Sequence, residues 1–352
     1  MLRLLPFSLV LFLVLQAHAI NWKQSLRQDA DWYSSDEAVR VADIVILYQR
    51  EAGGWPKNTD MAVELSSSDI EKLREAKNDN EDCTIDNGAT HTQLRYLARV
   101  YQATKLERLQ TAFNDGVEFL LKIQYDNGGW PQFPYKKGYY THITFNDGAM
   151  IGVMNVLKDI ADAKQPYAFV ADDLSKRCAE AFKKGVQCIL DCQIEVDGAR
   201  TVWCAQHDET TLKPAPARTY EKISLSGAES AGVVEFLMEL DKPSPQIKGA
   251  IHAAMAWFEA AAIHGTKVVQ KPDPNLPKGY DRIVVKDESA PPMWARFYEI
   301  GTNRPIFCGR DGVIKYSLAE IEHERRVGYS WYTNNPSKLV NRIYPEWKAK
   351  VE

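Results

Sequence analysis

The 352-residue sequence lacks features that mark several large functional classes. After its first twenty residues it has no apolar run near the roughly 20 residues that a transmembrane helix needs. It has no excess of positive charge, because 43 Lys and Arg residues stand against 47 Asp and Glu residues. A general nucleic-acid binder is normally basic. These absences predict a soluble protein that binds neither a membrane nor nucleic acid.

Three familiar motifs are also missing. There is no Gly-x-Ser-x-Gly nucleophile turn, no phosphate-binding glycine loop, and no Cys-x-x-Cys pair with a matching His pair. His91, His142 and His207 each stand alone, which is more typical of structural histidines than of catalytic ones. The six cysteines permit disulfides in an oxidising compartment, but the sequence does not give their pairing.

The first 19 residues, MLRLLPFSLVLFLVLQAHA, have the pattern of a secretory signal peptide. One cation, Arg3, precedes an apolar run over residues 4–15, and a small-x-small sequence ends at Ala19. The run is too short for a membrane anchor. We expect cleavage after Ala19, a secreted or periplasmic protein, and a single domain over residues 20–352.

Helical periodicity dominates the rest of the chain. Apolar residues recur at helical spacing in seven stretches, which predicts amphipathic helices. Strand signals are few, and the best is DRIVVKD at 281–287. The predicted fold class is mostly α, with a long loop-rich C-terminal region that includes residues 271–312. The predicted helices cover residues 36–49, 88–103, 107–123, 148–163, 174–192, 227–240 and 247–264.

A Trp-bearing loop follows a helix three times. EAGGWPKN and DNGGWPQF share Gly-Gly-Trp-Pro, each with a Gln four residues before the first Gly, and DGARTVWC is a worn third copy. Trp55, Trp130 and Trp203 lie 75 and 73 residues apart. This period predicts stacked antiparallel helix pairs, closed or partly closed into a ring. The motif is interpreted as scaffold, because its glycines end a helix and its Pro prevents continuation. Triterpene cyclases, which are also helical barrels, share its Gln-x-x-x-Gly-x-Trp spacing.

Polar turns precede two of the helices. Asp86 and Asn87 stand in TIDNGATHTQ, and Asn146 and Asp147 stand in TFNDGAMIGV. For either turn alone, capping of the helix N-terminus is the simpler interpretation. Equivalent turns in neighbouring helix pairs would open at the same end of the ring and converge. Convergent oxygens from Asp and Asn are suitable ligands for Ca²⁺.

Arginines are concentrated in the late loop region. Arg282, Arg296, Arg304 and Arg310 fall within 29 residues, among aromatic residues that include Tyr298. Isolated surface arginines or structural ion pairs are the simpler interpretation. Because Arg forks bind planar carboxylates bidentately, the cluster favours an anionic ligand. A glycoside hydrolase with Asp86 and Asp147 as acid and base is the competing hypothesis, although nearby arginines would lower the pKa that its general acid needs raised.

Five segments occur in an order that resembles the family 10 polysaccharide lyases, which are pectate lyases. The resemblance covers almost all of residues 20–352, and the last segment is the most specific. It implies an α/α toroid and calcium-dependent cleavage of polygalacturonate by anti β-elimination. The segments are TIDNGATHTQLRYL, GGWPQF, TFNDGAMIGVMNVL, PARTYE and PMWARFYEIGTNRPIFCGRDG.

The resemblance also implies roles for individual residues. Asp86 and Asp147 match the calcium-site aspartates, and Asn87 joins them in the predicted calcium site. Arg296 matches the catalytic base that removes the C5 proton of a galacturonate. The predicted substrate-binding residues are Arg218, Arg282, Arg310, Trp130 and Tyr298.

An arginine base requires an unusual environment, because free arginine stays protonated at ordinary pH. We expect Arg282, Arg310, Ca²⁺ and burial to lower the pKa of Arg296, and activity to favour alkaline pH. A non-catalytic pectin-binding protein is the remaining alternative. The protein is expected to be monomeric, and the sequence leaves open endo or exo action and the preferred chain length.

Overall fold

A computed structural model describes residues 20–352, so the predicted signal peptide lies outside the described residues. The described chain is mostly helical, as the sequence predicted, and all seven predicted helices are present with slightly shifted ends. The main helices are α2 (Asp36–Tyr48), α3 (Ser67–Glu75), α4 (His91–Thr104), α5 (Glu107–Lys122), α6 (Ala149–Ala161), α7 (Asp172–Asp191), α8 (Glu229–Met238) and α9 (Pro245–Ala260). Four shorter helices are α1 (Trp22–Ser25), α10 (His323–Gly328), α11 (Asn335–Lys338) and α12 (Tyr344–Val351).

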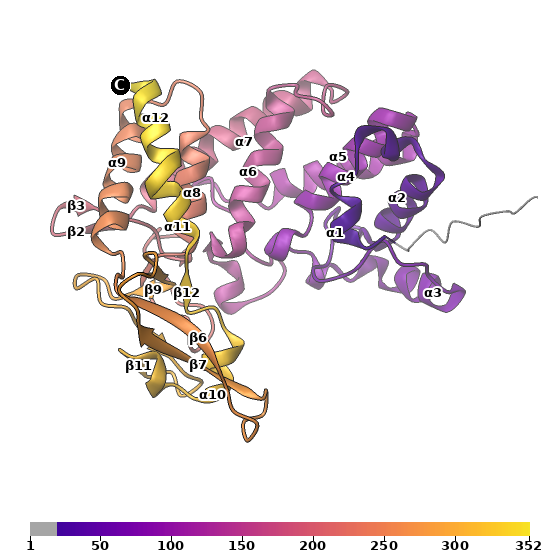
Figure 1. Cartoon of the computed structure of the whole chain (residues 1–352). Helices are drawn as coiled ribbons and strands as arrows, with labels where there is room; N and C mark the ends of the chain where they lie inside the picture. Colours follow the sequence, from indigo (N-terminus) through magenta and orange to yellow (C-terminus); the bar gives the residue numbers. More distant parts are fainter. Residues whose placement is uncertain (1–19) are drawn as a thin grey trace, which may run out of the picture.

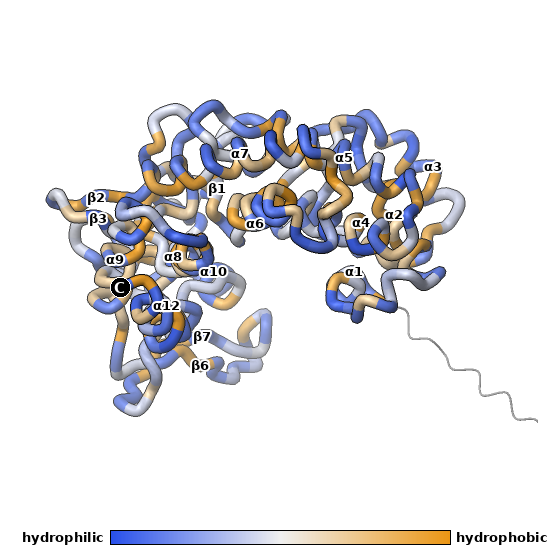
Figure 2. The backbone as a smooth tube through the Cα atoms, turned by 90° about the horizontal axis from the view of Figure 1, so that it is seen from above, coloured by the Kyte–Doolittle hydropathy of each residue, from blue (hydrophilic) through white to orange (hydrophobic). Residues whose placement is uncertain are grey.

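The helices pack as antiparallel pairs in two layers. Helix α4 packs on α5, α6 on α7, and α8 on α9. Within one layer α2, α4, α6 and α8 are successive neighbours, and in the other α5, α7 and α9 are. Figure 2 shows these pairs along an open arc, with α5 and α7 on the outside of the curve. The ring of helix pairs is therefore partly closed.

The repeated Gln and Trp hold one helix pair to the next. Each Trp side chain is fully buried and donates its Nε1 to a carbonyl of the preceding helix. Gln49 donates both to Gly53 O in its own loop and to Ala112 O in α5, each at 2.9 Å. Gln124 and Gln193 repeat this bridge to the next outer helix. The Trp bonds are Trp55 to Val45 at 2.7 Å, Trp130 to Leu120 at 2.8 Å, Trp203 to Ile189 at 2.6 Å, and a fourth, unpredicted, Trp294 to Phe258 at 2.8 Å.

The first glycine of each Gly-Gly-Trp-Pro copy is required by close packing. Gly53 and Gly128 have φ angles of 97° and 91°, in the left-handed region that favours glycine. A Cβ atom on Gly53 would lie 2.3 Å from Asp115 O, and one on Gly128 would lie 2.2 Å from Lys184 O. The motif therefore recurs because the same loop meets the same outer helix in each repeat.

The C-terminal region is folded around small antiparallel strand pairs and its own buried cluster. The predicted strand is β7 (Tyr280–Lys286), and it pairs with β6 (Thr266–Pro272), which the sequence analysis missed. A buried aromatic cluster around Phe297, Phe307 and Trp331 packs this region beside the helices (Figure 1). The other strand pairs are β8 (Trp294–Ala295) with β12 (Tyr332–Thr333), β5 (Leu225–Ser226) with β9 (Phe297–Tyr298), β10 (Phe307–Cys308) with β11 (Ile314–Lys315), β1 (Ile143–Thr144) with β4 (Gln206–His207), and β2 (Glu195–Val196) with β3 (Ala199–Arg200).

The six cysteines are all free and buried, so none of the permitted disulfides is formed. Within residues 20–352, no helix combines the length and the apolar character that spanning a bilayer requires.

Candidate active site

The two polar turns lie side by side, one before α4 and the other before α6. They form short 3₁₀ segments, η4 (Asp86–Gly88) and η6 (Asn146–Gly148). Asn87 and Asp147 occupy the same left-handed position, with φ angles of 50° and 49°, which Asn and Asp tolerate better than other residues. Asp86 and Asn146 are buried at the preceding position, and Asn87 and Asp147 are exposed. The turns are thus structural repeats that pair a buried side chain with an exposed one.

These side chains do not cap helices. Helix α4 follows Thr90 and α6 follows Gly148, and neither residue caps its helix through a side-chain hydrogen bond. Capping was the simpler interpretation of the Asp and Asn residues, and it is wrong because both turns end before the helices begin. Their polar groups are free to serve another purpose.

Asp86 has an unused oxygen in a buried position. Its side chain is 3% exposed, and one carboxylate oxygen contacts the ammonium group of Lys57. The other oxygen, Oδ1, has no hydrogen-bond partner among the described residues. A buried carboxylate oxygen without a donor is costly unless a cation or water pairs with it. The oxygen-rich set of Asp86, Asn87 and Asp147 therefore fits a bound Ca²⁺.

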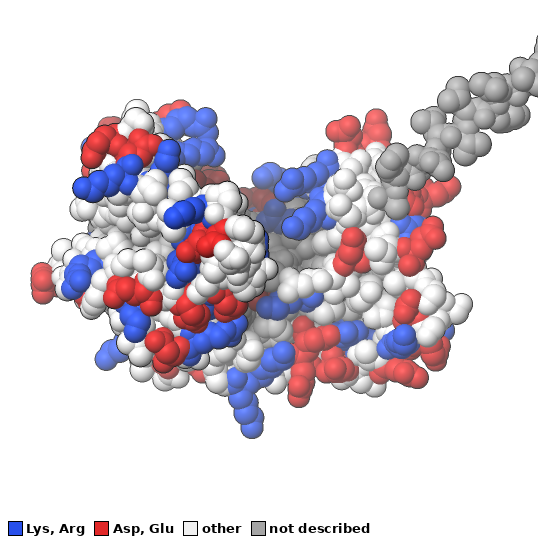
Figure 3. All heavy atoms as spheres, turned by 60° about the horizontal axis from the view of Figure 1, so that its bottom comes forward, with Lys and Arg blue, Asp and Glu red and all other residues white. Residues whose placement is uncertain are grey.

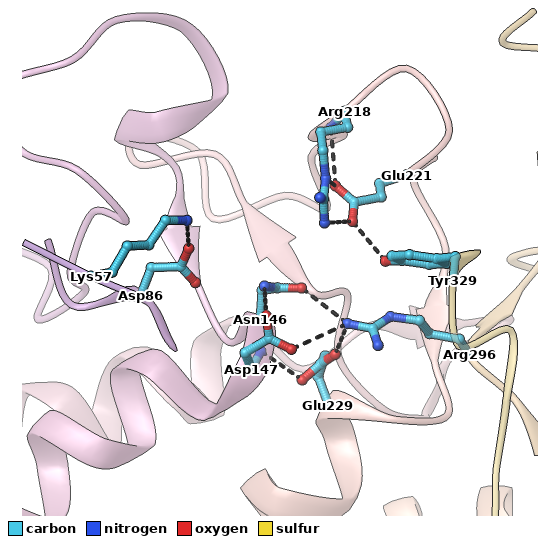
Figure 4. A network of polar contacts seen from close by, with 9 residues as sticks. All are labelled: Lys57, Asp86, Asn146, Asp147, Arg218, Glu221, Glu229, Arg296 and Tyr329. Atoms are coloured by element: carbon cyan, nitrogen blue, oxygen red, sulfur yellow. Dashed lines mark hydrogen bonds and ion pairs between the residues drawn. The ribbon is translucent and has the colours of Figure 1, made fainter. Parts of the chain in front are cut away.

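A cavity of about 370 Å³ separates the turns from the loop that carries Arg218. Figure 4 shows Asp86 and Asp147 on one side of this space, with Arg218 and Glu221 on another. The lining is polar, with acidic oxygens beside cationic groups, which suits an anionic sugar. Its lining residues include Lys57, Asp86, Asn87, Lys136, Tyr139, Tyr140, Asn146, Asp147, Arg218 and Glu221.

Arg296 is held beside Asp147 by a buried glutamate. Its Nη2 lies 2.6 Å from Glu229 Oε1, 3.2 Å from Asn146 Oδ1 and 3.6 Å from Asp147 Oδ1. The side chains of Arg296 and Glu229 are 12% and 8% exposed. The other oxygen of Glu229 accepts the backbone N–H of Asp147 at 3.0 Å. Glu229 therefore fixes both the turn and the guanidinium (Figure 4).

The protein groups around Arg296 favour its charged form. Burial acts to lower the pKa of Arg296, but the nearby Glu229, Tyr329 and Asp147 outweigh burial and raise the pKa. Burial also raises the pKa of Glu229, to about 7, against the opposing effect of Arg296. The predicted ring of cations is absent from the described surroundings of Arg296, because its close partners are acidic.

Arg282 and Arg310 lie apart from that guanidinium. Arg282 on β7 donates its Nη1 to the backbone carbonyl of Tyr329 at 2.7 Å, so it supports the segment whose ring stacks on Arg296. Arg310 is exposed and pairs with Glu324 at 3.0 Å. It lines a further cavity of about 490 Å³ together with Arg218.

Arg218 reaches the cavity from the opposite wall. Its guanidinium forms a fork with Glu221 at 2.8 and 2.5 Å, and Tyr329 donates its hydroxyl to the same glutamate at 2.7 Å. The paired Glu221 raises the pKa of Arg218 well above its usual range.

Lys57, Glu221, Glu229 and Tyr329 were not predicted as site residues. The best sequence signal for Glu229 was the third polar turn, SLSGAESAGV, whose place in the repeat puts it beside the other two.

Trp130 and Tyr298 were predicted to contact the substrate, but the structure places both side chains in the core. Trp130 is 0% and Tyr298 1% exposed. Both polar atoms are satisfied inside the protein, because the Trp130 indole donates to Leu120 O and the Tyr298 hydroxyl donates to Ala261 O. Neither side chain is a wall of the cavity; both belong to the core that supports it.

A second polar cluster lies beside the pair β1 and β4. One ligand atom from each of His142, Asp208 and Glu209 lies within 4.8 Å of the others, a spacing that could hold a metal ion. These atoms already bond to protein: His142 Nδ1 lies 2.9 Å from Glu209 Oε2, and Asp208 Oδ1 accepts the backbone N–H of Thr211 at 2.7 Å. Internal hydrogen bonds therefore account for the cluster.

The surface of the molecule is hollowed, with charged side chains around the hollow. Figure 3 shows a recess between the two halves of the molecule, with Lys and Arg side chains on both of its sides. Cations around a recess concentrate an anionic ligand there, although the chain as a whole is slightly acidic.

Comparison with solved structures indicates the class of protein. The structure is similar to that of a family 10 polysaccharide lyase from Cellvibrio cellulosa, with a TM-score of 0.74, 35% identity, and coverage of 89% of this chain and 93% of that chain. A mutant of a family 10 polysaccharide lyase from the same organism, in complex with trigalaturonic acid, gives a TM-score of 0.75, 36% identity, and coverage of 89% and 94%. The helical fold is thus that of a polysaccharide lyase.

The family follows from the sequence. Residues 49–340 match the family described as pectic acid lyase. The chain therefore belongs to the pectic acid lyase family, and it is a pectate lyase enzyme. A comparison with curated proteins gave no match.

Proposed function

We propose that the protein is a calcium-dependent pectate lyase that cleaves de-esterified polygalacturonate by anti β-elimination. The observation that carries this proposal is the cavity that brings Asp86, Asp147 and Arg218 together, with a buried oxygen of Asp86 lacking a partner. The relative solved with trigalaturonic acid supports an oligogalacturonate as the ligand. Family membership favours a lyase over the glycoside hydrolase and the non-catalytic binding protein.

Asp86, Asn87 and Asp147 would hold the calcium ion. Two carboxylates and one amide oxygen are hard ligands of the kind that Ca²⁺ prefers. When bound there, calcium would supply positive charge that stabilises the sugar carboxylate as the neighbouring C5 proton leaves. Lys57 contacts Asp86 in the described structure and supplies a positive charge at the same place.

The reaction needs a base and stabilisation of negative charge. Removal of the C5 proton places charge on the carboxylate attached to C5, and arginine forks stabilise that charge. The electron pair then forms the C4–C5 double bond as the C4–O4 bond breaks. The departing oxygen takes up a proton, and an unsaturated sugar remains at the new chain end.

Two arginines are candidates for the base. Arg296 is the residue that the family resemblance implies. Arg218 is favoured by the geometry, because it lines the cavity with Asp86 and Asp147, whereas Arg296 lines an adjoining cavity on the Glu229 side of Asp147. The charge of the paired glutamate raises the pKa of either guanidinium. Activity is therefore expected to rise toward alkaline pH, where loss of the proton is easier.

An absorbance assay tests the proposed reaction. The purified protein is mixed with polygalacturonate, with calcium or with EDTA, and ultraviolet absorbance is followed. The new double bond is conjugated with the carboxylate, so absorbance should rise with calcium and stay flat with EDTA. A rise that EDTA does not affect would remove the calcium requirement, and reducing ends without absorbance would indicate hydrolysis.

Arg218→Gln and Arg296→Gln separate the two candidate bases. Loss of the base should lower kcat by about 10² or more with a small change in KM, because proton transfer is lost. Loss of an arginine that only binds the substrate should mainly raise KM. If both variants change only KM, neither residue is the base.

We also propose that the protein is exported and that it is a monomer. The leader pattern supports cleavage after Ala19, so the exported protein should begin at Ile20. N-terminal sequencing and light scattering of the protein from the periplasm or medium test the two statements.

A further inference from the structure

A second cavity of about 450 Å³ adjoins the candidate active site on the side of α1. Lys57 and Asn87 line both cavities, so the two spaces meet at the turn that carries Asp86. Figure 2 shows α1 on the open side of the arc, close to α2 and α4. A chain that leaves the first cavity past Asp86 therefore passes into the second.

The second cavity contains groups that recognise an acidic sugar. The cations among the described lining residues are Lys23 and Lys57, and Asn58 and Thr59 add polar side chains. Trp22 is partly exposed there and gives the cavity an aromatic surface, which suits the apolar face of a sugar ring. Such a mixture of aromatic surface and a few placed polar groups is typical of ligand sites.

The wall that carries Lys23 is fixed to the fold. Trp22 donates its backbone N–H to Asp60 Oδ1 at 2.8 Å, and its ring packs on Tyr96 with ring centroids 5.3 Å apart. Among residues 20–352, Asp60 is the one acidic residue of this lining, and the same oxygen also accepts the N–H of Ala62 at 3.1 Å. The carboxylate is therefore partly neutralised by backbone donors. The segment that carries Lys23 is therefore an ordered part of the cavity wall.

We propose that this cavity is a distal subsite that binds an additional galacturonate residue of a long substrate chain, with Lys23 paired to its carboxylate. The proposal rests on the proposed function, because it extends the same substrate beyond the candidate active site. Each sugar of polygalacturonate carries one carboxylate, so a row of cations along the path favours long chains over short ones. The subsite would make chain length a determinant of kcat/KM.

Charge reversal at Lys23 tests the subsite. We compare the wild type with Lys23→Glu on trigalacturonate and hexagalacturonate. Lys176→Glu on the outer helix α7 is the matched control, because it changes the net charge equally at an exposed position that lines neither of these cavities. In Lys23→Glu the ratio of kcat/KM for the hexamer to that for the trimer should fall about tenfold, and in the control it should not change. High salt should reduce the effect.

The possible outcomes separate failure of the subsite from failure of the proposed function. An equal loss on both oligomers, or the same loss in the control, overturns the distal subsite while leaving the lyase intact. If the wild type cleaves neither polygalacturonate nor these oligomers, the proposed function fails, and calorimetric binding of hexagalacturonate tests the subsite directly. A dissociation constant about tenfold weaker in Lys23→Glu than in the wild type supports the subsite, and equal constants overturn it.

Discussion

Glu229 joins Arg296 to the turn of Asp147 through its two carboxylate oxygens. One oxygen lies 2.6 Å from the guanidinium, and the other accepts the Asp147 N–H at 3.0 Å. Arg296 comes from the C-terminal region, Asp147 precedes α6, and Glu229 begins α8. One buried side chain therefore sets the relative position of three segments that are far apart in the sequence.

Glu229→Gln should lower both stability and activity. The amide still accepts the Asp147 N–H, but it cannot neutralise the largely buried Arg296. Breaking a buried ion pair in this way costs about 3 kcal/mol in the free energy of unfolding. Urea unfolding at about pH 8, above the pKa of about 7 of Glu229, measures the loss while the carboxyl group is ionised.

The matched control for this substitution is Glu118→Gln. Glu118 pairs with Arg177 at 2.6 Å, but their side chains are 49% and 45% exposed. The same chemical change there should cost less than about 1 kcal/mol and leave activity unchanged. If the two substitutions lowered the free energy of unfolding by similar amounts, burial would not make the Glu229 pair more important for stability than the exposed pair.

Asp86→Asn should weaken calcium binding. The change removes one negative charge from the proposed ligand set and places an amide beside Lys57, while the side-chain shape is kept. We expect an affinity for Ca²⁺ at least about tenfold lower, because ligand charge sets affinity in such sites. Calorimetric titration measures it, with Asp43→Asn, whose partner is the exposed Arg108, as the control. Unchanged calcium affinity in Asp86→Asn would place the ion elsewhere.

Trp130→Phe should change stability rather than substrate binding. The substitution removes the hydrogen bond to Leu120 O and part of a fully buried side chain, at a cost of about 1 to 3 kcal/mol. Trp203→Phe should behave alike, because Trp203 makes the equivalent bond to Ile189 O. If KM rose in Trp130→Phe but not in Trp203→Phe, the prediction that Trp130 contacts the substrate would be supported.

Acidification should destabilise the fold through two buried histidines. Burial lowers the pKa of His91 to about 3 and that of His207 to about 4, below an unfolded value of about 6.5. The unfolded chain therefore takes up protons first as pH falls from about 6.5, and stability is lost down to the folded pKa values. Each histidine contributes a slope of about 1.4 kcal/mol per pH unit within that window.

Urea unfolding between about pH 7 and pH 5 checks this slope. His207→Gln should give a shallower dependence on pH, whatever its stability at neutral pH. His264→Gln, at an exposed position, should keep the slope of the wild type. An unchanged slope in His207→Gln would mean that His207 does not carry the acid sensitivity.

Much of the fold was predictable because its repeat is local. The Gln and Trp of each loop hydrogen-bond to the preceding helix and the next outer helix in the same way, so their spacing in the sequence reports the spacing of the helix pairs. Strand β6 was missed because its pairing partner lies across a hairpin, and neither strand contains a buried residue that would mark an apolar face. The leader and the cellular location remain predictions.

The candidate site was predictable only in part. The polar turns could be placed together, because equivalent positions of a repeat converge. The neighbours of each arginine could not be predicted: Arg296 pairs with Glu229 at a separation of 67 residues, and Arg218 with a glutamate only three residues away. The Arg296 pair depends on which segments meet in the folded chain, and a sequence pattern does not encode that meeting. The Arg218 pair is local, but nothing in the sequence marked Glu221 as the partner rather than another nearby group.

The sequence by itself determined the helix pairs, the family, and the two turns that carry Asp86 and Asp147. Hydrophobic period, glycine and tryptophan spacing, and local turn chemistry act over a few residues, and they can be read along the chain. Only the tertiary structure decided that Trp130 and Tyr298 are core residues, that Glu229 holds Arg296, and that Lys23 lies beside the site. Burial and charge pairing are properties of the packed chain, because they depend on which surfaces exclude water together.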